Sequence, residues 1–402
     1  MPHYKNDLNS HKYWLGSVGV KINNFSEIFR LSGYSLFIVT FSFFYYTQLA
    51  VITNLSSTAN IFRGVTFFIL FLGLFFRKYS IREIFLIVML FLFSLYVSSQ
   101  SKSIDTLVTL FLIVAMRQIE FRKIVRVDFY TRLISTIAIF ILSSIRYIPT
   151  LDMYRGSTLR HSFGFYHPNL FGAYILILTL EFIYLGYLKN RNSYRVWVIL
   201  PVVWFIGKAT DDRSVEIALI IFFLLYFLLQ IPYFKEAPSN FYKAITVVTF
   251  TSVSLISLFS SYEYNPTIGI WTIINKLLSG RPELINTIVK GFYPIRWFGQ
   301  NTPLLGDSGV IVNGVTKFLY ADNSYMSILI KFGICTFLVF TFWVLKNSFS
   351  FLEGKNKLIM FCWLIAMLAW GLSENKLILV QFNILLFSYF EGNKEELKCK
   401  NI

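Results

Sequence analysis

Apolar residues recur along this chain in long runs, and short segments between the runs hold most of the charged residues. A helix needs about 17–25 mostly apolar residues to cross a bilayer, and runs near this length recur along almost the whole chain. Several runs are short or interrupted by glycine. We predict about twelve membrane spans, at 33–52, 61–76, 84–100, 104–116, 131–149, 168–188, 195–209, 214–234, 243–262, 323–345, 357–372 and 376–391. The pattern predicts an all-α polytopic membrane protein.

The longest break in this pattern, residues 263–322, is far longer than a connector needs, and it contains an apolar stretch of its own. We therefore expect a large, partly helical extracytoplasmic loop between spans 9 and 10. The chain is then divided into a cytoplasmic N-terminal segment (1–30), spans 1–9 (31–262), the large loop (263–322), spans 10–12 (323–391) and a cytoplasmic tail (392–402). Residues 1–30 are polar and mixed, so we expect no cleaved signal peptide.

Composition supports a membrane location, because only 14% of the residues are charged, whereas soluble domains have about 25%. Lys and Arg gather in every second loop, which the positive-inside rule assigns to the cytoplasm. Those segments are 1–30, 77–83, 116–132, 189–195, 235–243, 346–357 and the C-terminal tail. Both termini are therefore predicted to be cytoplasmic. This topology and attraction to anionic lipid explain the net charge of +16, so no nucleic-acid partner is expected.

The three cysteines, Cys335, Cys362 and Cys399, lie in predicted spans or in the cytoplasmic tail. They have no extracellular partners for a disulfide framework, and the chain has no spacing typical of metal ligands. We expect neither a metal nor another cofactor.

The stretch RHSFGFYHPNLFGAY, residues 160–174, places scarce polar residues just before an apolar span. Pro168 suits the first position of a helix, where its missing N–H is not needed. His167 would then cap that helix, and Asn169 would lie in its first turn. Because a helix N-terminus presents free N–H groups and partial positive charge, this point is suited to bind an anion.

Three more basic side chains, Arg155, Arg160 and His161, precede this helix start. Together they would make a cationic pocket, rich in hydrogen-bond donors, at the outer membrane face. The alternative is interfacial anchoring, because Arg, His and Tyr all favour the level of the lipid head groups.

A second polar stretch, LLSGRPELINTIVKG, lies inside the large loop. Pro282 and Gly291 mark a helix start and end, and Leu284, Ile285, Ile288 and Val289 form one apolar face. We predict a short amphipathic helix with Arg281 at its positive end, again suited to an oxyanion. The preceding IGIWTIINKLL is apolar enough to rest on the membrane surface.

Two further stretches carry polar residues beside span ends. In KATDDRSVEIAL, residues Asp211, Asp212, Arg213 and Glu216 crowd the tops of spans 7 and 8. Charged residues at a span end indicate function, or else an Asp–Arg ion pair with Asp212 as a helix cap.

In ADNSYMSILIKFGI, Asp322 or Asn323 is expected to cap span 10. Capping explains one of them but not Asp322, Asn323 and Tyr325 together. Within the predicted spans, only Glu181 and Lys331 are plausible charges, and no pair for them is evident, so we expect the chemistry at the outer face rather than at the midplane.

Taken together, these stretches resemble the Wzy-type polysaccharide polymerases and the related O-antigen ligases, membrane glycosyltransferases with a GT-C-like fold. GFYHPNLFGAY is similar to the family's Gly-Phe-x-His-Pro-Asn segment, and TDDRSVEIAL to its Ser-Arg-Gly-containing segment. SGRPEL resembles a Ser-Gly-Arg element early in the large loop, and DNSYMSILIKFGI resembles the Asp/His-Asn-x-Tyr-Leu…Gly element that closes it. The resemblance covers about residues 155–335.

At two points this sequence departs from the family pattern, which limits the residue roles that the resemblance implies. The Ser-Arg-Gly element is degenerate, with Asp212-Arg213-Ser214 in its place, so only the arginine matches. The ligases have a histidine where this chain has Asp322, and the large loop of this chain contains no histidine.

The resemblance implies a bacterial plasma-membrane enzyme that joins polyprenyl-diphosphate-linked oligosaccharides and releases polyprenyl diphosphate, without a metal. Arg160, Arg213 and Arg281 would stabilise the departing diphosphate, because arginine binds phosphate oxygens bidentately. Asp322 is the first candidate for the general base and His167 the second. The expected substrate-binding residues are Arg155, His161, Asn169, Asn323 and Tyr325. Expected partners are membrane lipid and the chain-length regulator and flippase of the same pathway.

Two other functions compete with the polymerase. A ligase would attach finished glycan to another acceptor, and Asp322 in place of histidine disfavours it. A flippase or exporter of the same lipid-linked glycan would need a charged cavity along several spans, which the sequence does not indicate.

Overall fold

The computed structural model describes residues 25–49, 56–77, 79–190, 194–312 and 315–390. Within these residues, six helices are long and apolar enough to cross a membrane: Phe25–Tyr45, Thr58–Phe75, Ile81–Ser101, Pro168–Tyr187, Ser239–Tyr262 and Ser324–Leu352. Two shorter helices, Asp105–Met116 and Lys357–Trp370, are also apolar. The protein is therefore a mainly helical membrane protein, as its sequence predicts.

Helices form most of the described chain. In chain order they are the helix Phe25–Tyr45, which ends in the π-helical turn η1 (Phe41–Tyr45), α3 (Ser56–Phe75), α4 (Ile81–Ser101), α5 (Asp105–Met116), α6 (Phe121–Ser144), α7 (Pro168–Tyr187), η2 (Tyr194–Val198), α8 (Ile199–Ala209), α9 (Arg213–Leu228), α10 (Pro232–Lys235), α11 (Ser239–Tyr262), α12 (Gly269–Leu277), α13 (Arg281–Gly291), α14 (Ser324–Ser327), η3 (Ile328–Phe332), α15 (Gly333–Leu352), α16 (Lys357–Trp370) and η4 (Ile384–Phe390). The strands form two antiparallel pairs, β1 (Met153–Arg155) with β2 (Thr158–Arg160) and β3 (Gly306–Val312) with β4 (Val315–Leu319).

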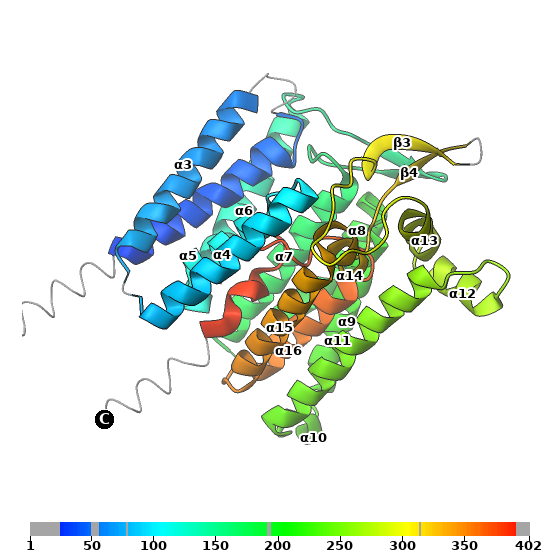
Figure 1. Cartoon of the computed structure of the whole chain (residues 1–402). Coiled ribbons are helices and arrows are strands. Elements are labelled where there is room, and N and C mark those ends of the chain that lie inside the picture. Colours follow the sequence, from blue (N-terminus) through cyan, green and yellow to red (C-terminus); the bar gives the residue numbers. More distant parts are fainter. Residues whose placement is uncertain (1–24, 50–55, 78, 191–193, 313–314, 391–402) are drawn as a thin grey trace, which may run out of the picture.

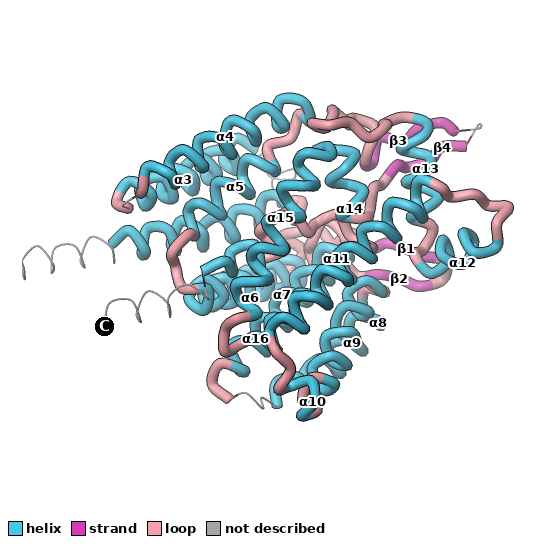
Figure 2. The backbone as a smooth tube through the Cα atoms, turned by 60° about the horizontal axis from the view of Figure 1, so that its bottom comes forward, coloured by secondary structure: helices cyan, strands magenta, loops and turns pink. Residues whose placement is uncertain are grey.

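The long helices run side by side, with β3, β4, α12 and α13 gathered at one end of the bundle (Figure 1). The second view places β1 and β2 at this same end (Figure 2). The described chain begins and ends at the opposite end (Figure 1). The polar segments predicted to share one side of the membrane therefore do share one end of the bundle, which we call the loop end.

The helices differ in how much of their surface is covered by protein. In α7, 78% of the most apolar window is buried, against 11% in α4. Phe85 on α4 and Phe68 on α3 are 68% and 60% exposed. Apolar side chains this exposed over whole helices suit contact with lipid, so α7 is the central helix and α3 and α4 lie at the periphery.

A helix overlaps each of the first eleven predicted spans, but the twelfth prediction is wrong. Residues 376–383 form turns, and only the short 3₁₀ helix η4 follows. The predicted count of about twelve spans stays a prediction, since the described helices include short and broken ones. Apolar composition alone indicated a span here because it reports burial and not backbone conformation.

The irregular segment 371–383 is buried in the bundle, and neighbouring helices bind its backbone carbonyls. Thr109 Oγ1 donates to the carbonyl of Ile378 at 3.0 Å, and Arg132 Nη2 donates to that of Gln381 at 2.9 Å. Non-helical backbone within a membrane is tolerated only where protein or water satisfies its polar groups. These contacts therefore hold the segment that follows α16 in place.

Arg132 corrects the predicted boundaries of the fifth span. The prediction counted it in a cytoplasmic loop, but α6 begins at Phe121 and places Arg132 and Asp128 inside the bundle, both with 0% exposure. Arg132 Nη2 donates to Asp128 Oδ1 at 2.9 Å. Lys331, for which the sequence showed no evident pair, forms an ion pair with Asp105 at 2.9 Å. The helical spacing of four between Asp128 and Arg132 was the signal for the first pair.

Candidate active site

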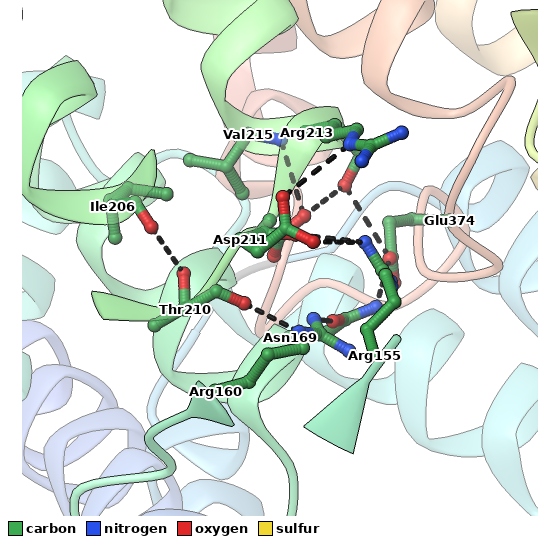
Figure 3. A network of polar contacts seen from close by, with 11 residues as sticks. Arg155, Arg160, Asn169, Ile206, Thr210, Asp211, Arg213, Val215 and Glu374 are labelled. Atoms are coloured by element: carbon green, nitrogen blue, oxygen red, sulfur yellow. Dashed lines mark hydrogen bonds and ion pairs between the residues drawn. The ribbon is translucent and has the colours of Figure 1, made fainter. Parts of the chain in front are cut away.

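A hydrogen-bond network connects three separate parts of the chain at the loop end (Figure 3). Arg160, at the end of β2, donates from Nε to the carbonyl of Thr210 at 2.6 Å and from Nη2 to Asn169 Oδ1. Asn169 donates from Nδ2 to Glu374 Oε1 at 3.0 Å. Arg160 and Glu374 are 5% and 1% exposed, so this network is part of the interior and its geometry is fixed by its partners.

Glu374 is the residue that joins the predicted stretches, and it is not among the site residues predicted from the sequence. Its Oε2 forms an ion pair with Lys376 Nζ, and its Oε1 lies 3.5 Å from Ser214 Oγ. Its carbonyl accepts from Ser324 Oγ at 2.5 Å. The available signal was the polar run SENK, residues 373–376, between two apolar segments.

Asp212 caps α9 beside this network. Its Oδ1 accepts from Ser214 Oγ at 2.6 Å and from the N–H of Val215 at 3.4 Å, while its Oδ2 is buried and has no partner within the described residues. Burial, and then the charge of Glu374, raise the pKa of Asp212 to about 6. The cap predicted as the alternative for this stretch is confirmed.

The ion pair of that alternative is also confirmed. Arg213 Nε lies 3.4 Å from Asp211 Oδ1, and Arg155 Nη1 donates to the carbonyl of Asp211 at 2.9 Å. The Arg155 and Arg213 side chains are 40% and 65% exposed, so solvent screens these pairs. Both guanidinium groups can therefore exchange Asp211 for an anionic ligand at low cost.

Gly172 allows α7 to approach the start of α9. A Cβ at this position would overlap Asp212 Oδ2 and lie 3.1 Å from Asp212 Cγ. In α3, the exposed Gly64 has no atom within 4 Å of such a Cβ. The close approach of α7 and α9 therefore depends on the absence of a side chain at residue 172. Gly64 in α3 has no such close neighbour and serves as a comparison.

Gly172→Ala is expected to lower the melting temperature in detergent, because the methyl group displaces Asp212 from the network. Gly64→Ala is the matched control, and it should leave the temperature unchanged or raise it, since alanine stabilises an open helix position by roughly 0.5–1 kcal/mol. Equal effects of the two substitutions would show that the contact between Gly172 and Asp212 has no energetic role.

His167 caps α7 as predicted, with Nδ1 accepting from the N–H of Asn169 at 3.0 Å. Burial, and then the charges of Arg160 and Lys376, lower the pKa of His167 to about 4. A neutral imidazole that accepts at Nδ1 carries its proton on Nε2. His167 therefore has an N–H donor at Nε2 and no free acceptor, which argues against the predicted second choice of general base.

His161 is less closely tied to the network. Its Nδ1 lies 2.9 Å from Asp152 Oδ2, and its N–H donates to the carbonyl of Ala209 at 2.8 Å. The backbone N–H of His161 thus ties the β1–β2 hairpin to the end of α8, while the ring pairs with Asp152 within the hairpin segment. The structure places His161 beside the predicted pocket, with its ring paired to Asp152.

Two adjacent residues at the end of the large loop have different roles: Asn323 caps a helix, and Asp322 is the candidate base. Asn323, not Asp322, caps α14, since Asn323 Oδ1 accepts from the N–H of Met326 at 3.0 Å. The Asn323 amide also donates to Ser257 Oγ at 2.9 Å and to the carbonyl of Leu372 at 3.1 Å. These contacts assign Asn323 a structural role.

Tyr325 is 1% exposed, and its hydroxyl donates to the carbonyl of Leu368 at 2.8 Å. This geometry supports packing rather than the predicted contact with substrate. Asp322 lies beside the network instead, where its Oδ1 accepts from Asn375 Nδ2 at 3.4 Å. Burial, and then the charge of Glu374, raise the pKa of Asp322 to about 6, although Lys376 and Arg281 oppose this.

Arg281 pairs with no carboxylate in the described part of the chain. It begins α13, the amphipathic helix predicted for the large loop, whose buried face includes Ile285 and Ile288. Its Nη1 donates weakly to the carbonyl of Leu278 at 3.4 Å, and its Nε is buried with no partner. Its positive charge lowers the pKa of Asp322, so an anion bound by Arg281 would lie within electrostatic reach of the candidate base.

Among the described residues, no group of three or more His, Cys, Asp or Glu side chains could hold a metal ion. Comparison of the chain with models of protein families, with curated proteins and with solved structures gives no match. A function for this site must therefore be argued from its residues.

Proposed function

We propose that this protein is a glycosyltransferase of the Wzy type, which polymerises polyprenyl-diphosphate-linked oligosaccharide repeat units and releases polyprenyl diphosphate. One observation carries the proposal. Three predicted stretches converge on Glu374 at the loop end of a helix bundle, and beside them Asp322 lies within electrostatic reach of Arg281, which pairs with no carboxylate among the described residues. A cation without a carboxylate partner beside a partly buried carboxylate suits transfer from an anionic leaving group.

The contacts divide the predicted arginines by role. Arg160 uses Nε and Nη2 within the protein, so it positions Asn169 and the start of α7. Arg281 has free donors, and Arg213 is mostly exposed. These two would bind the diphosphate, and the Nε2–H of His167 would donate to it as a neutral group. Binding by guanidinium forks stabilises the charge that develops as the diphosphate leaves.

The transfer step would use Asp322 as the base. A hydroxyl of the incoming repeat unit attacks the anomeric carbon of the growing chain, and its proton passes to Asp322. The bond from that carbon to the diphosphate oxygen breaks, and polyprenyl diphosphate leaves with the electron pair. A raised pKa improves a carboxylate as a base as long as it remains ionised at the working pH.

The setting of this reaction belongs to the same proposal. The loop end would face outward from the bacterial plasma membrane, with both termini in the cytoplasm and about twelve spans between them. The partners would be the lipid-linked substrate, membrane lipid, and the flippase and chain-length regulator of the pathway. Reporter fusions that place residues 263–320 in the cytoplasm would contradict the proposal.

The rate of chain growth should fall as the pH drops below about 6, where Asp322 becomes protonated. Lys376→Met should move this limb of the pH–rate profile to higher pH, because the positive charge that lowers the Asp322 pKa is removed. A limb unmoved by Lys376→Met would indicate that another group titrates.

Folding raises the pKa of Asp212 as well. Its contribution to stability is therefore largest below its ordinary pKa and declines as the pH rises through about 6. Melting temperatures measured beside the pH–rate profile separate this effect on stability from the loss of activity.

Glu374→Gln should lower the stability of the fold by roughly 1–3 kcal/mol, because the charge that pairs with Lys376 is lost and the amide NH2 must face a donor, either Lys376 or Asn169. The double variant Glu374→Gln/Lys376→Met should regain part of that loss. Thermal unfolding of both variants measures this. A single variant as stable as the wild type would refute the central role of Glu374 in holding the network.

Purified protein supplied with a lipid-linked repeat unit tests the function. Longer lipid-linked chains are the expected product. Transfer to a different acceptor would instead identify a ligase, and an unchanged substrate moved across a vesicle membrane would identify a flippase. The buried Asp128–Arg132 pair does not favour the flippase, because it binds the 371–383 segment and lines neither of the two cavities described below.

A further inference from the structure

Two cavities adjoin one another on the side of the bundle formed by α4, α5 and α15. The first is an apolar groove of about 160 Å³, lined by Leu90 on α4, Leu110 and Ile113 on α5, and Val339 on α15. The second is a polar cavity of about 440 Å³ nearer the loop end, and its lining includes Lys102, Asp105 and Lys331. Ile378 lines both, so the groove and the cavity adjoin at this side chain.

The polar cavity leads to the candidate active site. Asn375 lines it, and the same side chain donates to Asp322 at 3.4 Å. The segment 374–376 thus contributes Glu374 to the Arg160–Asn169–Glu374 network and Asn375 to the lining of the polar cavity. A molecule in this cavity would contact Asn375, the side chain that donates to Asp322.

The linings suit a molecule with an apolar chain and an anionic head that carries sugars. The groove follows α5 from Thr106 to Arg117, which gives the chain a path along the membrane depth. In the polar cavity, Lys102 is exposed and forms no ion pair within the described residues. Lys331 forms an ion pair with Asp105. The cavity also presents Asn301 and Thr302, whose amide and hydroxyl groups suit sugar hydroxyls.

We propose that this groove and cavity bind a polyprenyl-diphosphate-linked saccharide, with the isoprenoid chain between α4, α5 and α15 and the diphosphate near Lys102 and Lys331. The assignment rests on the proposed function, and it adds a substrate site separate from Arg281. Transfer between two lipid-linked chains requires two such sites. The polar cavity would then hold one substrate while the Arg281 side holds the other, with Asp322 between them.

Photo-crosslinking tests the chain site. The probe is a polyprenyl diphosphate with a diazirine in its isoprenoid chain, added to the full-length protein in phosphatidylglycerol-containing vesicles. We expect label on the groove residues of α4, α5 and α15, and unlabelled polyprenyl diphosphate should compete. Competition by added phosphatidylglycerol, or equal labelling of both faces of α4, would show annular lipid only and overturn the proposal.

A matched pair of substitutions on α4 sharpens the test. Leu90 lines the groove, whereas Leu92 is 56% exposed and does not. Leu90→Trp should fill the groove and reduce crosslinking roughly tenfold, while Leu92→Trp should leave it unchanged. Melting temperatures show that both variants fold. Equal crosslinking in the two folded variants would contradict the assignment.

A second pair of substitutions tests whether the polar cavity binds the diphosphate. Lys102→Gln should weaken binding of the probe roughly tenfold, because a charge-assisted contact to phosphate is lost. Lys290→Gln, at the exposed end of α13, is the control and should bind normally. Equal affinity of the two variants would remove the diphosphate from the cavity.

These measurements need no turnover, so they are independent of the polymerase assay. Specific crosslinking in a protein that makes no polymer would keep the lipid site and reject the polymerase. Polymer formation without groove labelling would keep the polymerase and reject this site.

Discussion

Arg281→Ala should reduce polymer formation by about 10²–10³-fold, the usual cost of removing one preorganised group that stabilises transition-state charge. The protein should still insert and fold, because Arg281 makes one weak hydrogen bond within the described chain. The single lipid-linked repeat unit should accumulate. Gel analysis of glycan length, together with the amount of unreacted substrate, measures both effects.

Arg281→Lys should restore little of this activity, since an ammonium group cannot reproduce the planar fork that binds two phosphate oxygens. The control is Lys290→Ala, which removes a positive charge from the exposed far end of the same helix. It should polymerise normally. Full activity in Arg281→Lys would reduce Arg281 to a general positive charge, and full activity in Arg281→Ala would exclude it from the reaction.

Asp322→Asn should lower turnover by about 10²-fold or more, because it removes the proposed general base. The structure makes this test cleaner than the sequence did. Asn323 caps α14, so a change at Asp322 leaves the cap in place and stability should change little. Initial rates at pH 7 and melting temperatures of the same preparations provide the two readouts.

Two control variants distinguish loss of the general base from loss of stability or of any carboxylate. Asn323→Ala should lower stability by about 1 kcal/mol or more through loss of the cap, and Asp322→Asn should not. Glu263→Gln, at an exposed position after α11, makes a similar carboxylate-to-amide change and should polymerise normally. If Asp322→Asn keeps a normal rate, no base is needed here and arginine stabilisation of the diphosphate must carry the reaction.

Local signals predicted the elements that depend on a few neighbouring residues. Pro168 and His167 identify the start of α7, and the proline and glycine around Arg281 identify α13, because capping and helix punctuation act within one turn. The sharing of one bundle end by the polar stretches followed from counting spans and basic loops.

The rest of the site depends on contacts between distant residues, which a single sequence does not show. Glu374 contacts Asn169, 205 residues earlier, and its segment is irregular because side chains such as Thr109 and Arg132 satisfy its backbone. Only hydropathy was available at residues 376–391, and it could not distinguish such a segment from a helix. Arg132 was misplaced for a related reason, since its charge suggested a loop.

The central claim is that the site at the loop end joins two lipid-linked chains and releases polyprenyl diphosphate. The most direct measurement is the amount of polyprenyl diphosphate released for each new glycosidic linkage, determined by mass spectrometry on purified protein in vesicles. We expect one released for each linkage formed, and neither product from the double variant Arg281→Ala/Asp322→Asn. Chain growth without release, release without growth, or unchanged products from the double variant would contradict the proposed reaction at this site.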